Sequence, residues 1–384
     1  MQYQKVFDQN FINQLPSFDK FSNPSVVALC KRNEPSLDAF RSQIEKWFQN
    51  LPENQKADMY SRLRSLDDRQ HLSAFYELLF HQYFLEENWK IQKHPSINGQ
   101  TPDFIVDIPS QNINFFLEVA TLMDEDKLKQ NEERYNKLLR KINDIRTDFL
   151  VSVHLKEWLS EKINYDSITL DIKRWLSKLQ KTEKAHYKVE ISKSGFHGSI
   201  DASYYSDIKP QSGCVFAWSP PCGSGNPIIE QVKKVIGEKV KRYKFTKNSG
   251  KPFVIALCSS GQFLFDDFAI DSALYGNTVI SFNVNDPKSE TKVHRDNSGM
   301  ITPNPGLLGQ PRNTRVSAVI FCAKVWNKEK MLYNMRVFHN PWAITKLSLK
   351  IFEKMPQLVE INKNQPGFIT LGWHNDNKQY IVFE

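Results

Sequence analysis

Apolar residues recur with two different periods in residues 71–121, and the two periods predict different elements. Over residues 71–86 they follow the spacing of a helix, around a polar stripe formed by Ser73, Glu77 and His81. Over residues 113–121 they occupy both faces of a period of two. The two faces are Ile113, Phe115, Leu117 and Val119, and Asn114, Phe116, Glu118 and Ala120. This pattern is typical of a central strand buried on both faces, and it predicts a buried acid at Glu118.

Two more strands are predicted between that helix and the strand that carries Glu118. We expect a strand at residues 89–95, a turn at 96–100 and a second strand at 104–108. The second strand is entered through Pro102 and Asp103, and a proline there keeps the preceding residue extended. Residues 110–112 leave a gap of hairpin length before the third strand. The expected order is one helix followed by three strands, with acids on three of these elements.

The three acids, Glu77, Asp103 and Glu118, suggest a metal site. Burying an ionised carboxylate is costly unless it is paired or binds a metal. Asp103 and Glu118 lie at neighbouring strand ends, so they can share one divalent cation. Glu77 by itself also fits a solvated helix face, and Asp103 by itself fits a turn or cap after proline. Their succession along the chain favours the metal site.

A second amphipathic helix is predicted at residues 228–245, and a short buried strand follows it at 252–258. The apolar face of the helix comprises Ile229, Val232, Ile236, Val240 and Tyr243. Lys239 falls within this face. A lysine that faces a sheet needs a nearby anion, and the strand carboxylates are candidates. The alternative is a lysine whose ammonium reaches the edge of the helix and stays in water.

Positive charge is concentrated around this helix. Residues 227–251 hold eight Lys or Arg against two Glu, within a chain of 384 residues whose formal net charge is +8. A basic helix face beside a cleft attracts phosphates. The candidate nucleic-acid contacts are Lys233, Lys234, Lys241, Arg242 and Tyr243. Tyr243 either stacks on a base or packs in the core.

The remaining segments are expected to surround this core. Residues 1–70 are helical in pattern. Residues 124–226 are expected to interrupt the core as a largely helical insertion. Its elements are helices at 124–149 and 168–184, a hairpin at 187–205 and a connecting loop at 219–226 in which Asn226 caps the next helix.

The C-terminal part is expected to extend the sheet. A loop rich in Gly, Asn, Pro and Asp at about 283–313 precedes two alternating segments, at 315–325 and 331–338. We therefore divide the chain into a helical N-terminal region at 1–70, a core at 71–260 and a C-terminal extension at 261–384.

Composition narrows the class of protein further. Apolar residues make up 40% and aromatic residues 12% of the chain, enough for a large core. The five cysteines show no zinc-ligand spacing and read as ordinary thiols of a reducing compartment. The N-terminus lacks an apolar signal core, and no run approaches the ~18 apolar residues of a membrane span. We expect a soluble cytoplasmic protein.

The order of a helix glutamate, Pro102-Asp103 and the strand glutamate resembles the PD-(D/E)xK nuclease superfamily. The resemblance implies an α/β fold with a restriction-endonuclease-like α-β-β-β-α-β core. It also implies that Asp103 and Glu118 hold Mg²⁺ or Mn²⁺, while Glu77 binds a second metal or a metal-bound water. The family motif places a lysine two residues after the strand glutamate, and Ala120 stands there instead.

Lys239 is the expected replacement for that lysine. Lys239-Val-Lys-Arg-Tyr243 resembles the Gln-x-x-x-Tyr motif of the exonuclease branch, with lysine in place of glutamine. The overall pattern is similar to bacterial proteins built on this nuclease core. Glu77, Asp103, Glu118 and Lys239 are therefore the expected catalytic residues.

The resemblance implies a metal-dependent nuclease that acts on DNA rather than RNA, and as an endonuclease rather than an exonuclease. Bacterial restriction or anti-phage defence is the expected setting, with a homodimer and partner proteins of a defence system as expected assemblies. The departure at Ala120 leaves a second hypothesis open. It is a catalytically inactive nuclease fold that serves as a nucleic-acid-binding or assembly module.

Overall fold

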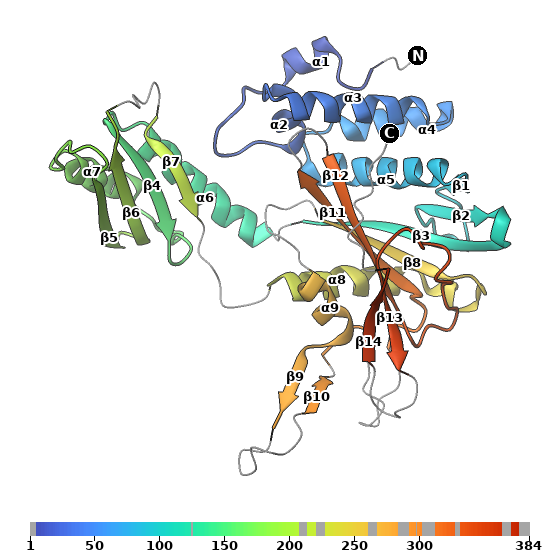
Figure 1. Ribbon diagram of the computed structural model, residues 1–384. Coiled ribbons are helices and arrows are strands. Elements are labelled where there is room, and N and C mark those ends of the chain that lie inside the picture. The colour runs from blue at the N-terminus through green and yellow to red at the C-terminus, as the bar shows by residue number, and fades with distance from the viewer. Residues whose placement is uncertain are drawn as a thin grey trace. The chain divides into compact units, whose positions relative to one another are not determined.

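The computed structural model describes residues 5–123, 126–206, 213–219, 227–259, 267–282, 292–296, 298–301, 312–326, 331–362 and 370–375 (Figure 1). The chain divides into two compact units. We call them the core unit, Met1–Phe18, Pro24–Met123 and Asn226–Glu384, and the inserted unit, Asp19–Asn23 and Asp124–Gly225. The residues expected to interrupt the core thus fall almost entirely in the inserted unit.

A mixed eight-stranded sheet organises the core unit. Its strands, in spatial order, are β1 (Lys90–Lys93), β2 (Phe104–Ile108), β3 (Ile113–Leu122), β8 (Phe253–Ser259), β11 (Ala318–Trp326), β12 (Met331–His339), β13 (Gln357–Asn362) and β14 (Thr370–His374). β3, β8 and β11 are parallel neighbours, and β1, β2 and β3 pair antiparallel. The chain is therefore of the mixed α/β class, with the predicted β3 in the interior of the sheet.

Helices cover both faces of this sheet, because β3 and β8 are apolar on both sides. Phe115, Leu117 and Val119 belong to one apolar cluster, while Phe116 and Ala120 belong to another, as the period of two predicted. The first cluster contains residues of α1 (Gln9–Gln14), α2 (Ser25–Lys31), α3 (Pro35–Gln49), α4 (Glu53–Leu63) and α5 (Asp68–Glu86). The second contains residues of α8 (Pro227–Arg242) and α9 (Asp267–Tyr275).

The elements that carry the candidate site follow the expected order in the chain. They are α5, β1, β2, β3, α8 and β8. The predicted helix at 228–245 ends earlier, at Arg242, and a 3₁₀ turn, η2 (Lys244–Asn248), follows it. The predicted Asn226 cap and nearly all of the 219–226 loop lie outside the described residues.

The C-terminal pair is confirmed as β11 and β12, which join antiparallel and extend the sheet beyond β8. Several short elements were not predicted. A two-stranded ribbon, β9 (Thr278–Ser281) and β10 (Lys292–Arg295), enters the segment expected to be a loop, and β13 and β14 add to the sheet. Strands this short carry too few alternations to be seen in the sequence.

The insertion contains more strand than the two helices and the hairpin that were predicted. The inserted unit has a four-stranded sheet of order β5-β6-β4-β7, with β5 (His186–Lys193), β6 (Phe196–Tyr204), β4 (Phe149–Leu155) and β7 (Val215–Ser219). The helices α6 (Asp126–Asn143) and α7 (Tyr165–Leu176) are shorter than expected and share an apolar core with the sheet. β4 alternates buried and half-buried residues, and this period of two begins where the predicted first helix was expected to end.

The predicted hairpin is confirmed as β5 and β6. It turns at Ser194 and Gly195, whose φ angles of 53° and 84° are left-handed. Glycine reaches this region at no steric cost, which explains its place in the turn. Separately, no helix within the described ranges is long and apolar enough to cross a membrane.

Candidate active site

Asp103 and Glu118 are held together by their own backbone. The antiparallel register of β2 and β3 pairs Phe104 with Leu117, so Asp103, which directly precedes β2, lies beside Glu118 on β3. Asp103 Oδ2 accepts a hydrogen bond from the Val119 N–H at 2.7 Å, and Glu118 Oε2 accepts one from the Asp103 N–H at 3.3 Å. This reciprocal arrangement fixes both carboxylates without using all of their lone pairs.

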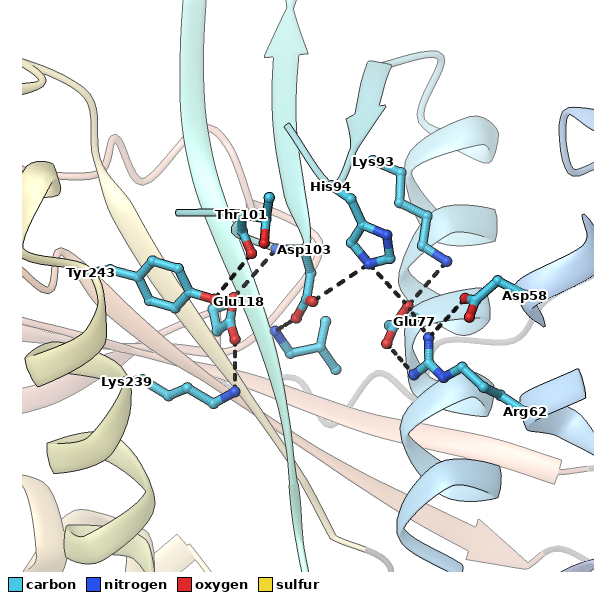
Figure 2. Close-up of polar contacts among 11 residues, drawn as sticks. Asp58, Arg62, Glu77, Lys93, His94, Thr101, Asp103, Glu118, Lys239 and Tyr243 are labelled. Atoms are coloured by element: carbon cyan, nitrogen blue, oxygen red, sulfur yellow. Dashed lines mark hydrogen bonds and ion pairs between the residues drawn. The ribbon is translucent and has the colours of Figure 1, made fainter. Parts of the chain in front are cut away.

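Lys239 reaches these acids from α8 (Figure 2). Its Nζ lies 2.7 Å from Glu118 Oε1, and the side chains of Lys239 and Glu118 are 22% and 2% exposed. Val232, Ile236 and Val240 are buried on the apolar face of α8, and that face directs Lys239 toward the sheet. The structure therefore brings the predicted lysine to a predicted acid, 121 residues away in sequence.

Tyr243 is buried, so the predicted nucleic-acid contact at this residue is not supported. Its ring packs against Phe253, with ring centroids 5.7 Å apart, and its hydroxyl donates to the Thr101 carbonyl at 3.2 Å (Figure 2). Burial raises the pKa of the phenol well above its ordinary value. Of the two roles that the sequence left open for Tyr243, packing in the core is the one the structure supports.

Glu77 is buried on α5 and is held by two cations. Arg62 forms two hydrogen bonds with its carboxylate, and Lys93 Nζ lies 3.0 Å from Oε2. Burial alone would raise the pKa of Glu77, but Arg62 and Lys93 outweigh it and hold the pKa below its ordinary value. The alternative of a solvated helix face is therefore wrong.

His94 is a member of the site that the sequence did not reveal. Its Nε2 lies 3.7 Å from Glu77 Oε2 and 3.9 Å from Asp103 Oδ1. Its φ of 48° is left-handed, and its N–H donates to the Asp103 carbonyl at 2.9 Å. Residues other than glycine rarely adopt this left-handed conformation, and those that do are common at functional sites. A histidine followed by proline at the end of the first strand was the available signal.

Asp103 is the least compensated acid of the group. Within the described part of the chain it forms no ion pair with a lysine or arginine, and His94 is its nearest basic side chain. Burial, together with the neighbouring Glu118 and Glu77 carboxylates, raises the pKa of Asp103 to about 8. A cation placed beside Asp103 would relieve this charge.

The donor atoms fit a divalent cation, although not in the predicted combination. Glu77, His94 and Asp103 each offer one ligand atom, and these atoms lie within 4.8 Å of one another. Glu118, expected as a ligand with Asp103, instead has one oxygen on Lys239 and the other on the Asp103 N–H. Carboxylates suit Mg²⁺ and Mn²⁺, while an imidazole ligand suits transition metals better than Mg²⁺.

The basic residues predicted on α8 are accessible to different degrees. Lys234, Lys241 and Arg242 are exposed, whereas Lys233 is half-buried and pairs with Glu230 at 2.9 Å. Arg242 lies over the Tyr243 ring, 5.4 Å from its centroid. Lys241 and Arg242 lie in the last turn of the helix that also carries Lys239, and Lys234 lies in the middle of that helix.

Comparison of the chain with protein-family models, with curated proteins and with solved structures finds no match. The chemistry of the site is therefore argued from its geometry. That geometry brings three carboxylates, one imidazole and three cationic side chains together from α4, α5, β1, β3, α8 and the segment between β1 and β2.

Proposed function

We propose that the protein is a metal-dependent nuclease that hydrolyses phosphodiester bonds of DNA on a restriction-endonuclease-like core. The observation that carries the proposal is the 2.7 Å approach of Lys239 Nζ to Glu118 Oε1, beside Asp103 on the adjoining strand. Two acids and an ammonium at one sheet position match the parts that the PD-(D/E)xK motif requires. The succession of α5, β1, β2, β3, α8 and β8 supports the same core.

Asp103 is the central metal ligand in this proposal, with His94 and Glu77 beside it. Glu118 is held by Lys239 and the Asp103 N–H. Asp103, His94 and Glu77 would hold Mg²⁺ or Mn²⁺, which would supply a metal-bound water of lowered pKa and would offset negative charge on the phosphate. The His94 imidazole favours Mn²⁺ over Mg²⁺. Neither ion needs a cysteine ligand, which agrees with the carboxylate-rich donor set.

Lys239 takes the role of the motif lysine, because the motif position is occupied by Ala120. The Lys239 ammonium is oriented by Glu118, so it can hold the attacking water or stabilise charge on the phosphate. Glu77 orients Lys93 and Arg62, which add positive charge on the opposite side of Asp103 (Figure 2). Lys234, Lys241 and Arg242 supply exposed positive charge for the DNA backbone.

Cleavage of plasmid, linear and single-stranded DNA with Mg²⁺ or Mn²⁺ tests the proposal. Wild type should cut at least one of them, Asp103→Ala should not, and Lys239→Ala should lower the rate by about 10²- to 10³-fold, as loss of one transition-state donor does. Lys354→Ala is the matched control, because Lys354 also forms a 2.7 Å ion pair, with Glu87, outside the site. Uncut DNA with wild type, or equal rates for wild type and Asp103→Ala, would overturn the proposal.

A second candidate function follows from the pairing of the acids. Arg62 and Lys93 compensate Glu77, and Lys239 compensates Glu118, so these two carboxylates are satisfied without a metal. A catalytically inactive nuclease fold that binds DNA through α8 would therefore need no metal ion at these carboxylates. It predicts salt-sensitive DNA binding that is unchanged by a chelator, whereas the nuclease predicts cleavage that a chelator abolishes.

A further inference from the structure

A row of polar side chains crosses the four-stranded sheet of the inserted unit. In β4, the residues Phe149, Val151 and Val153 are buried with α6 and α7, so His154 belongs to the opposite set of residues. The row comprises Ser219 on β7, His154 on β4, Asp201 and Ser203 on β6, and His186 on β5. No part of the proposed nuclease chemistry uses these residues.

Asp201 lies between the two imidazoles. His154 Nε2 is 3.2 Å from Asp201 Oδ2, and His186 Nε2 is 4.0 Å from Asp201 Oδ1. Each histidine therefore presents the same ring nitrogen to one oxygen of a single carboxylate. Three side chains that offer two imidazole nitrogens and a carboxylate form a donor set that transition metals prefer.

The other nitrogen of each ring is also occupied. His154 Nδ1 lies 2.9 Å from Ser219 Oγ, and His186 Nδ1 lies 3.1 Å from Ser203 Oγ. Histidines that bind a metal through one nitrogen usually donate a hydrogen bond through the other, which fixes the tautomer and the ring orientation. Both serine contacts supply this support.

Asp201 has one carboxylate oxygen that can still accept a ligand or a hydrogen bond. Its side chain is 17% exposed, and Oδ1 is buried with no hydrogen-bond partner among the described residues. Such atoms are uncommon in native proteins and call for a partner. Lys188 faces Asp201 in the β5–β6 register, but its ammonium pairs with Glu190 at 3.3 Å.

We propose that His154, His186 and Asp201 bind one divalent transition-metal ion, with Zn²⁺ as the representative case. Zinc lies about 2.0–2.2 Å from such ligands, so two ligands of one tetrahedral ion are about 3.4 Å apart. The 3.2 Å between His154 and Asp201 is close to this separation. Among the described residues, three donor atoms lie within 4.8 Å of one another at Glu77, His94 and Asp103 and not at these three side chains. The proposal therefore requires His186, which is 62% exposed, to turn inward when the ion binds.

Zn²⁺ titration of the full chain by calorimetry tests the site. An Asp103→Asn background removes the contribution of the core unit. One Zn²⁺ should bind, and His154→Ala, His186→Ala and Asp201→Asn should each weaken binding by more than about 100-fold, because loss of a ligand exceeds loss of a supporting hydrogen bond. Ser219→Ala and Ser203→Ala should weaken binding by about 10- to 100-fold.

His197→Ala is the matched control. His197 also lies on β6, but it pairs with Glu157 at 3.1 Å, so this variant should bind Zn²⁺ as the background does.

Two further measurements keep the result unambiguous. Co²⁺ should give the visible absorption of a histidine-ligated site, and circular dichroism should show that each variant is folded. Zn²⁺ binding that is absent in the background chain, or equal in His154→Ala and the background, would overturn the proposal. Labelling of Ser219 by a fluorophosphonate in a chain that binds no Zn²⁺ would instead identify Ser219, His154 and Asp201 as a nucleophilic triad, and would also overturn it.

Discussion

The core unit and the inserted unit both place carboxylates beside nitrogen-bearing side chains, but they compensate the charge differently. In the core unit Glu77 and Glu118 are buried, and each is paired with lysine or arginine. In the inserted unit Asp201 is approached by two partly exposed imidazoles. Buried pairs of fixed charge are costly to break, whereas imidazoles can exchange a proton for a metal at little cost.

Asp103 combines features of both units. It belongs to the buried cluster of the core unit, yet its nearest basic neighbour is an imidazole, as in the inserted unit. Stability and function therefore place opposite demands on it. We expect Glu77 to be needed for folding, Asp103 to be needed for metal binding at the expense of stability, and Asp201 to matter little for folding.

The largest effect on stability is expected from Glu77→Gln. The change leaves Arg62 and Lys93 next to a neutral amide in a buried site, and removing one partner of a buried ion pair costs about 3–5 kcal/mol. The free energy of unfolding in urea measures this. Glu53→Gln is the control, since Glu53 is 75% exposed in its pair with Lys56, and exposed pairs contribute about 0–1 kcal/mol. Equal losses for both variants would contradict the assigned difference.

Asp103→Asn should stabilise the protein in the presence of a chelator, and more so at high pH. The pKa of Asp103 is raised from 3.8 to about 8 in the fold, so the folded state binds a proton that the unfolded state has lost between these values. Wild-type stability from this group therefore falls as pH rises from about 4 to 8, and asparagine escapes the loss. Thermal unfolding at pH 5 and pH 8.5 should show a larger gain at the higher pH. A variant less stable than wild type at pH 8.5 would count against the uncompensated charge.

The smallest effect is expected in the inserted unit. Asp201→Asn breaks a pair with His154, whose side chain is 39% exposed, so metal-free stability should change by no more than about 1 kcal/mol. Urea unfolding in chelator measures it. A loss as large as that of Glu77→Gln would mean that the two units do not differ in the way described.

The sequence was sufficient where local pattern decides structure. The two apolar faces of β3, and Lys239 within the apolar face of α8, follow from periodicity that tertiary packing preserves. The strand pair β11 and β12 is likewise predictable from its alternating apolar residues. Glu118 and Lys239 then meet because both must lie at the sheet surface.

Long-range partners could not be predicted in this way. Arg62 and Lys93 reach Glu77 through the packing of α4, α5 and β1, which no local period reports. The sheet of the inserted unit is not predicted because β4 closely follows the amphipathic helix α6, whose period of 3.6 dominates that segment. His154, His186 and Asp201 lie on three strands, and their meeting depends on strand order rather than on sequence spacing.

Binding of Mn²⁺ to the metal-free chain, followed by electron paramagnetic resonance, tests the central claim without requiring a DNA substrate. A His154→Ala background confines the signal to the core unit. The account predicts one bound Mn²⁺ that is lost in Asp103→Asn and kept in Asp58→Asn, a nearby acid that is 59% exposed in its pair with Arg62. No bound Mn²⁺ in the background chain, or equal binding with and without the Asp103 carboxylate, would contradict it.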